Sequence, residues 1–134
     1  MKIKCPICDF NDCDSLIVDL YICNNCSHIF KQGMNKYDKI NTLKNIHIIN
    51  DPIKSLCSLS DNMNPGMIAV FEFPSMMFTN LELFPNEFYH HKYKHYFNQM
   101  SLMVLLTRCG FAPFEQINIP YGKSCKTIIK VRKK

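Results

Sequence analysis

The sequence predicts an α/β fold whose N-terminal part is organised by a metal ion, and two observations carry this prediction. The first is a pair of Cys-x-x-Cys motifs within the first 26 residues. The second is the order of the elements expected after them, which is helix, strand, loop, helix, strand, strand. That order fits a parallel sheet that ends in an antiparallel hairpin. The chain has 134 residues, 47% of them hydrophobic, so it can build a small metal-bound unit and one compact core.

The two cysteine motifs are Cys5-Pro6-Ile7-Cys8 and Cys23-Asn24-Asn25-Cys26. Two residues between the cysteines let a tight turn aim both sulfurs at one point, and two such turns supply four thiolates to a tetrahedral zinc ion. Because four protein ligands leave no open position for water, such an ion has a structural role. It stabilises a segment that is too short to fold on apolar burial alone. The sequence therefore predicts Zn²⁺ bound by Cys5, Cys8, Cys23 and Cys26.

The residues around these motifs complete a predicted zinc ribbon over residues 1–32. Ser15 to Ile22 is rich in β-branched and apolar residues, which is typical of a strand, and Ser27 to Phe30 is expected to be the returning strand. Cys13 lies between the motifs and is expected to be a spare thiol. His28 could replace one of the ligands, but we expect it on the ribbon surface. The alternative is two disulfides in a secreted protein, which the lack of a signal-peptide pattern at the start of the sequence disfavours.

Charge and cysteine content limit the binding partners and the cellular compartment that the chain can be expected to have. The formal net charge is +5, and basic residues gather from Lys123 to Lys134. Such a tail could bind nucleic acid or another anion, but we expect a solvated terminus after a last strand. Eight cysteines, four of them beyond the predicted zinc ligands, indicate a reducing, cytoplasmic compartment. No uninterrupted apolar run approaches the ~20 residues of a membrane helix, so no membrane association is expected.

A polar linker at residues 33–36 is followed by a predicted domain over residues 37–134. Its first segments carry weak signals. Residues 37–41 are expected to form a short strand, and residues 43–49 an extended segment or loop.

Stronger signals mark a helix and a strand next. Asp51-Pro52 predicts a helix start, because Asp caps free backbone N–H groups and Pro fits the first turn. Asn64-Pro65-Gly66 ends that helix. Met67 to Phe73 is nearly continuous in apolar residues, which predicts a strand covered on both faces and ended by Pro74.

The last third of the domain contains a second helix and two strands. Residues 75–96 are irregular and rich in aromatic residues, so we expect a long functional loop or lid. A buried helix is predicted for residues 98–109, closed by Gly110 in the left-handed cap position. Residues 114–119 and 127–131 are predicted strands of a hairpin.

Several short motifs between Tyr37 and Lys134 resemble, in order, the second half of class I S-adenosylmethionine-dependent methyltransferases. The resemblance is to the group with an N-terminal zinc-binding domain, which includes sugar C-methyltransferases. The motifs are Tyr37-Asp38-Lys39-Ile40 for the fourth strand, His47 with Asn50-Asp51-Pro52, Asn64-Pro65-Gly66 with Glu72-Phe73-Pro74 for the fifth strand, Phe88 to Phe97 for the lid, Ser101 to Phe111, and Gly122-Lys123-Ser124. The resemblance implies a truncated Rossmann-like half-sheet over residues 37–134.

The cofactor-binding half of that family has no counterpart in this chain. The chain contains four glycines and no Gly-x-Gly, whereas the family holds the cofactor in a glycine-rich turn after its first strand. The missing half would fall between about Lys31 and Lys36. The chain is therefore not expected to bind S-adenosylmethionine alone. An uncovered fourth-strand edge invites pairing, so we expect a homodimer or a separate polypeptide to complete the sheet and supply the cofactor site.

The lid motif implies candidate catalytic residues. Relatives often carry a Tyr and a His suited to proton transfer. One alignment places these roles on His90 and Tyr93, and another aligns Tyr89-His90 but puts Lys92 at the second His. From the cluster of proton-transfer groups in this segment we take His90, His91 and Tyr93 as the candidate catalytic residues. Three nearby histidines, His90, His91 and His95, could instead bind a second metal. Exposed lid histidines without either role are the simplest expectation.

These observations rank three functions. The first is a degenerate or split methyltransferase-like zinc-binding protein. It could act as a scaffold, or it could transfer a methyl group to a small hydroxylated or sugar-like substrate if a partner restores the cofactor half. The second is a zinc-ribbon interaction module with no catalytic activity. The third is a transcription-type ribbon that binds nucleic acid, which is not favoured because Asp9, Asp12, Asp14 and Asp19 make the ribbon acidic. The sequence leaves open whether the chain is an enzyme.

Overall fold

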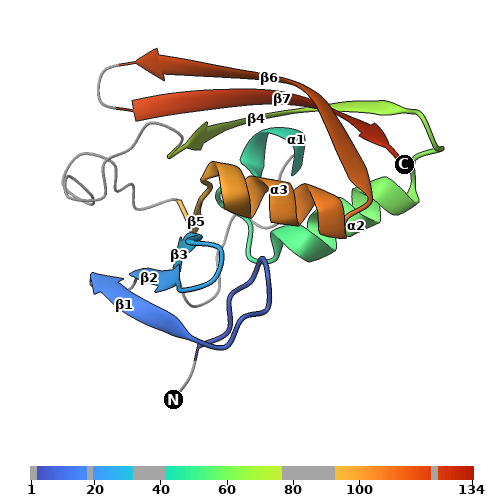
Figure 1. The fold of residues 1–134 in the computed structure, drawn as a ribbon. Coiled ribbons are helices and arrows are strands. Elements are labelled where there is room, and N and C mark those ends of the chain that lie inside the picture. The colour runs from blue at the N-terminus through green and yellow to red at the C-terminus, as the bar shows by residue number, and fades with distance from the viewer. Residues whose placement is uncertain (1–2, 18–19, 32–41, 77–92, 122–123) are drawn as a thin grey trace.

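The computed structural model describes residues 3–17, 20–31, 42–76, 93–121 and 124–134. Within these residues the chain is a mixed α/β protein with two antiparallel sheets, and its helices lie between the two sheets (Figure 1). One sheet follows the first cysteine motif and includes the strands on either side of the second, and the other sheet contains the C-terminal hairpin. The predicted linker at 33–36 and the predicted strand at 37–41 lie outside the described residues.

The N-terminal sheet has the order β1-β2-β3-β5, and every neighbouring pair is antiparallel. Its strands are β1 (Cys13–Ile17), β2 (Leu20–Cys23), β3 (Ile29–Lys31) and β5 (His95–Tyr96). The prediction of one strand over Ser15 to Ile22 is wrong, because the chain reverses within it and Ile17 pairs with Leu20. Between Ile17 and Leu20 the sequence has one turn-favouring residue, Asp19, and the prediction gave it too little weight beside the β-branched run. The predicted returning strand is present as β3.

The C-terminal sheet has the order β4-β7-β6. Its strands are β4 (Ile68–Ser75), β6 (Phe111–Tyr121) and β7 (Ser124–Lys133). The predicted terminal hairpin is confirmed as β6 and β7. The predicted parallel pairing is wrong for the described strands, because β7 lies between β4 and β6 and is antiparallel to both. β4 and β6 therefore share one direction, with a helix between them in the sequence, but they are not neighbours.

One face of the C-terminal sheet is open to solvent, which corrects the prediction that β4 is covered on both faces. Ile68 and Val70 are 53% and 42% exposed, whereas Phe71 and Phe73 are buried. This alternation is typical of an antiparallel strand with one solvated face. The strand also continues past Pro74 to Ser75. Proline is tolerated there because β4 has only one partner strand among the described residues.

The helices begin and end largely where local signals predict. α2 (Pro52–Asp61) is capped by Asp51, whose carboxylate accepts a hydrogen bond from the Lys54 amide at 3.1 Å. α3 (Gln99–Arg108) begins with a capping box formed by Asn98 and Ser101. Gly110 follows its C-cap at a φ of 78°, as expected of a left-handed position.

The first described helix corrects another prediction. α1 (Thr42–Asn45) is a single helical turn that contacts β4, where we expected extended chain or loop. Apolar periodicity cannot separate the two states in so short a segment. None of the described helices is long and apolar enough to cross a membrane.

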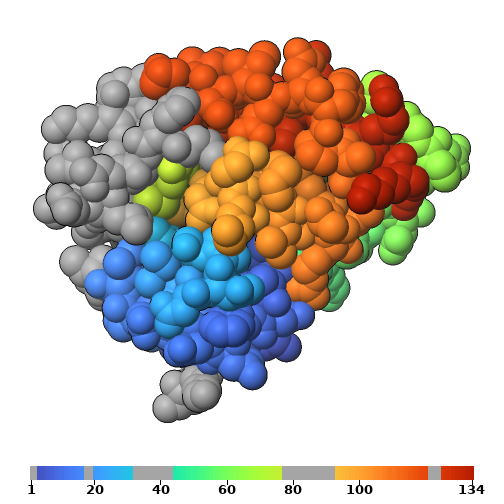
Figure 2. All heavy atoms as spheres, viewed as in Figure 1, coloured from blue at the N-terminus to red at the C-terminus, as the bar shows by residue number. Residues whose placement is uncertain are grey.

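The cysteine motifs share one hydrophobic core with the helices and the C-terminal sheet. Buried Cys5, Ile7 and Cys26 belong to the same cluster as Leu105 and Phe111. Figure 2 shows the N-terminal residues packed directly against α3. The strand pairing of β3 with β5 adds a backbone connection between the two parts. The ribbon is therefore continuous with the rest of the described fold.

Candidate metal centre

The structure brings the four predicted zinc ligands together. One sulfur from each of Cys5, Cys8, Cys23 and Cys26 lies within 4.8 Å of the others. The Sγ atoms of Cys5 and Cys26 are 3.7 Å apart, and those of Cys8 and Cys23 are 3.5 Å apart. Tetrahedral geometry with metal–sulfur bonds of ~2.3 Å requires sulfurs about 3.8 Å apart. The spacing therefore fits a four-coordinate metal ion.

The two cysteine turns have matching backbone geometry. In the first, the Asp9 amide donates to the Cys5 carbonyl at 3.0 Å, and in the second the Ser27 amide donates to the Cys23 carbonyl at 3.0 Å. Asp9 and Ser27 both follow the second cysteine of their motif, and both have positive φ, 68° and 63°. These left-handed residues turn the chain away after each motif so that both pairs of sulfurs face a common centre.

Backbone amides point at the sulfurs from inside each turn. The Ile7 amide donates to Cys5 Sγ at 3.4 Å, and the Asn25 amide donates to Cys23 Sγ at 3.3 Å. These two donors occupy the same position in the two motifs. Hydrogen bonds of this kind stabilise the charged form of the sulfur, which is the form that binds metal.

The close packing of the sulfurs shifts the pKa values of Cys5 and Cys26 in opposite directions. A hydrogen bond with Cys26 lowers the pKa of Cys5 to about 5, and the same interaction raises the pKa of Cys26. Burial raises the pKa of Cys23. Without a metal, the contact between Cys5 and Cys26 favours one ionised sulfur that accepts a hydrogen bond from the other thiol. A bound metal cation would take the place of the remaining protons, because metal-bound cysteines are thiolates.

The structure confirms the prediction for Cys13 and corrects the prediction for His28. Cys13 lies in β1 outside the four-sulfur cluster, as expected of a spare thiol, and burial raises its pKa to about 12. His28 is not on the ribbon surface but is fully buried between the ribbon and the rest of the fold. The signal for its burial was Phe30, two positions along the extended chain, whose buried ring stacks with that of His28 at 6.2 Å between centroids.

A buried histidine pair joins the ribbon to the helical layer. His95 Nε2 lies 2.9 Å from the Ile49 carbonyl oxygen, which can only accept, so this nitrogen carries the hydrogen. His95 Nδ1 is then an acceptor, and His28 Nε2 donates to it at 3.0 Å. Burial lowers the pKa of His95 to about 3 and that of His28 well below its usual range. The pair is neutral and structural, which corrects the expectation of an exposed His95 in the lid.

We expect this pair to make stability depend on pH. Since the folded pKa of His95 lies below its ordinary value of 6.5, the unfolded chain binds the extra proton as the pH falls. The contribution of His95 to the free energy of unfolding is therefore fully present above pH ~6.5. Below that pH it declines by ~1.4 kcal/mol per pH unit, until the pH reaches the folded pKa. Urea unfolding of the wild type and His95→Asn between pH 7.5 and 5.5 measures this. The variant retains all four metal ligands, and an equal pH slope in both proteins would contradict the assignment.

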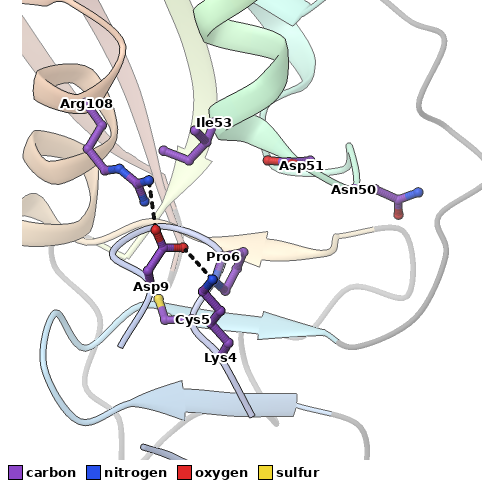
Figure 3. Close-up of a pocket in the computed structure, with 8 residues that line it drawn as sticks. All are labelled: Lys4, Cys5, Pro6, Asp9, Asn50, Asp51, Ile53 and Arg108. Carbon is purple, nitrogen blue, oxygen red and sulfur yellow. Dashed lines mark ion pairs between the residues drawn. The ribbon is translucent and has the colours of Figure 1, made fainter. Parts of the chain in front are cut away.

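Arg108 holds the first cysteine turn against α3 (Figure 3). Its guanidinium donates to the Ile7 carbonyl at 2.6 Å and lies 2.9 Å from the Asp9 carboxylate. Lys4 approaches the same carboxylate at 3.8 Å. These groups border a cleft of about 380 Å³ between the turn and the start of α2. Lys4 and Arg108 on its lining both pair with Asp9, and these contacts hold the cysteine turn in position.

One predicted catalytic residue lies in a second, smaller pocket. Tyr93 lines a pocket of about 230 Å³ at the end of β4, together with Lys44, Glu72, Phe73, Pro74 and Lys126. Its ring meets the buried His47 ring edge-on at 4.8 Å. The ion pair with Lys126 lowers the pKa of Glu72, so its carboxylate is charged at neutral pH. His90 and His91 lie outside the described residues.

Comparisons with known proteins do not assign the chain. No protein-family model matches it, and neither the curated proteins nor the solved structures contain a match. The functional assignment therefore depends on the sequence and the geometry of the sites. It gives a cluster of four cysteines that can hold a metal ion, and a small polar pocket at the end of β4.

Proposed function

We propose that the chain is a zinc-stabilised, methyltransferase-like protein that cannot hold S-adenosylmethionine alone. A partner, either a second copy or a separate polypeptide, would supply the cofactor-binding half. The observation that carries this proposal is the pocket in which Glu72 and Pro74 lie beside Tyr93. The resemblance to methyltransferases draws on these residues from two separate motifs, the end of the fifth strand and the lid. Their meeting in one pocket supports a substrate site there.

Zinc is the metal that best suits the cysteine cluster. Four thiolates at tetrahedral spacing form a typical structural zinc site, with no position left for water. The ion would keep the ribbon folded and would take no part in the reaction. The histidine pair and Arg108 then hold the folded ribbon against the helices.

The glycines support the inference that the cofactor pocket is missing. Gly66 and Gly110 have φ values of 91° and 78°, and they serve the turn before β4 and the end of α3. These positions are needed by the fold itself. Gly33 and Gly122 are isolated in the sequence, so no pair of glycines can form the close backbone cradle that a nucleotide-like cofactor needs.

The pocket offers groups suited to a small hydroxylated or sugar-like substrate. The charged Glu72 carboxylate can accept hydrogen bonds from hydroxyl groups, and the ammonium groups of Lys44 and Lys126 can donate them. Tyr93, with His90 and His91 of the lid, would move the proton of the reacting group. The methyl group itself would come from the cofactor held by the partner.

Calorimetric titration of the zinc-loaded chain with S-adenosylmethionine tests the proposal. We expect no saturable binding at millimolar cofactor, because the chain has no cradle for it. A pull-down should recover a second copy or a glycine-rich methyltransferase half, and the complex should then bind the cofactor. Tight binding by the chain alone would contradict the missing pocket.

A non-catalytic interaction module remains the second candidate, because the outer face of the C-terminal sheet exposes several large apolar side chains among its charged ones. Ile68, Val70, Phe114, Ile117 and Ile119 are each between 42% and 53% exposed. Exposed apolar residues gathered on one face are typical of a contact surface. The variant Glu72→Gln separates the candidates: it should abolish methyl transfer by the complex if the pocket binds substrate, and leave partner binding unchanged.

Nucleic-acid binding is less favoured than either candidate. The basic residues on the outer sheet face are engaged locally, since Lys126 pairs with Glu72, Lys130 pairs with Glu115 at 2.8 Å, and Arg132 lies over a phenylalanine ring. Binding of DNA or RNA that weakens steeply with salt would reverse this ranking.

A further inference from the structure

Two cysteines outside the metal centre meet between the two longer helices. Cys57 lies on α2 and Cys109 is the C-cap of α3. They are 52 residues apart in the sequence, yet their Sγ atoms are 3.3 Å apart. This is shorter than either sulfur–sulfur distance quoted above for the metal centre. The other two cysteines, Cys13 and Cys125, take no part in this contact.

The fold holds these two sulfurs in place from both sides. The Cys109 amide donates to the Leu105 carbonyl at 3.2 Å, which fixes its position at the end of α3. Its thiol donates to the Ile53 carbonyl of α2 at 3.5 Å. Cys57 Sγ lies 4.0 Å from the Arg108 carbonyl oxygen. Each thiol thus contacts the backbone of the opposite helix, so the sulfurs stay close without a covalent bond.

The two thiols differ in access. Cys57 is partly exposed, whereas Cys109 is only 4% exposed. Burial, and next the neighbouring thiol of Cys57, raise the pKa of Cys109. A reagent from solution therefore reacts with Cys57 first. Cys109 is then the second thiol to react, because it is protonated, buried and already in contact with the Cys57 sulfur.

We propose that Cys57 and Cys109 form a dithiol site that low-molecular-weight disulfides, such as oxidised glutathione, convert to an intramolecular disulfide. The Cys57 thiolate attacks one sulfur of the small disulfide, forms a mixed disulfide and releases one thiolate. Cys109 then attacks the Cys57 sulfur, gives its proton to the departing thiolate and releases the second small thiol. The two protein thiols are oxidised and one small disulfide is reduced to two thiols. The product fastens α2 to the end of α3.

The test uses the zinc-loaded chain, in which the four ribbon cysteines are protected by metal. The chain is incubated with oxidised glutathione, free thiols are alkylated, and intact mass and peptide maps are recorded. We expect the wild type to lose two hydrogen atoms, to carry no glutathione, and to yield one cross-linked peptide pair that contains Cys57 and Cys109. Dithiothreitol should reverse the change, and the oxidised form should melt at a higher temperature.

Single variants separate the two roles. Cys109→Ser should stop at one stable glutathione adduct on Cys57, and Cys57→Ser should remain unmodified at both positions. Cys13→Ser is the matched control and should form the same disulfide as the wild type. A wild type that keeps both thiols, retains glutathione on Cys57, or joins either residue to a different cysteine would overturn the proposal. The wild-type result decides the question even if a variant folds poorly.

Discussion

Chelation of the metal is expected to unfold the whole chain rather than the ribbon alone. Structural zinc contributes about 10–16 kcal/mol to the folding of small zinc domains, whereas a native domain is stable by only about 5–15 kcal/mol in total. The ribbon cysteines Cys5, Cys23 and Cys26 belong to the same buried cluster as Phe111 and Val131 of the C-terminal sheet. Loss of the ion therefore removes part of the core that the sheet needs.

The measurement is thermal unfolding by circular dichroism, before and after treatment with a strong zinc chelator. We expect the cooperative transition to disappear, with loss of both helical and strand signal, and to return when zinc is added back under reducing conditions. Cys26→Ser should behave like the chelated chain, and Cys13→Ser should behave like the wild type. A chelated chain that keeps its helical signal and a cooperative transition would contradict the shared core.

Phe97→Ala is expected to be the most damaging substitution outside the metal ligands. Phe97 is fully buried, and its ring centroid lies 4.8 Å from that of His28 and 5.4 Å from that of Phe73. It therefore fills the space where the ribbon meets the C-terminal sheet. Truncation of a buried phenylalanine leaves a cavity and costs about 3–5 kcal/mol, a large share of total stability.

Urea unfolding of the zinc-loaded variants measures this loss. The urea concentration at the midpoint should fall, while the slope of the unfolding free energy against urea concentration stays unchanged. Phe114→Ala is the matched control, because Phe114 is 47% exposed and its ring lies under the Arg132 guanidinium, whose Cζ is 4.8 Å from the ring centroid. That change should cost about 1 kcal/mol or less. Equal losses in the two variants would show that the ribbon junction carries no special share of the stability.

The features that local chemistry determines were predictable from the sequence. The spacing of Cys5, Cys8, Cys23 and Cys26 predicted a metal cluster, since two short turns suffice to gather the sulfurs. Capping by Asp51 and the glycine at Gly110 marked helix boundaries, because these residues satisfy or close a helix end within a few residues.

The features that depend on distant contacts were not predictable. The burial of His28 and His95 arises from pairing between β3 and β5, which are more than sixty residues apart. The contact between Cys57 and Cys109 depends on how α2 packs on α3. The open face of β4 arises because the described helices lie on one side of the C-terminal sheet, which a continuous apolar run does not reveal.

The rest of the fold depends on the metal centre, because its cysteines belong to the shared core. X-ray absorption at the zinc edge tests this centre most directly. The purified chain should contain one zinc ion, with a single shell of four sulfurs at about 2.3 Å. A shell that contains nitrogen or oxygen, or a folded chain without bound metal, would contradict the structural zinc centre.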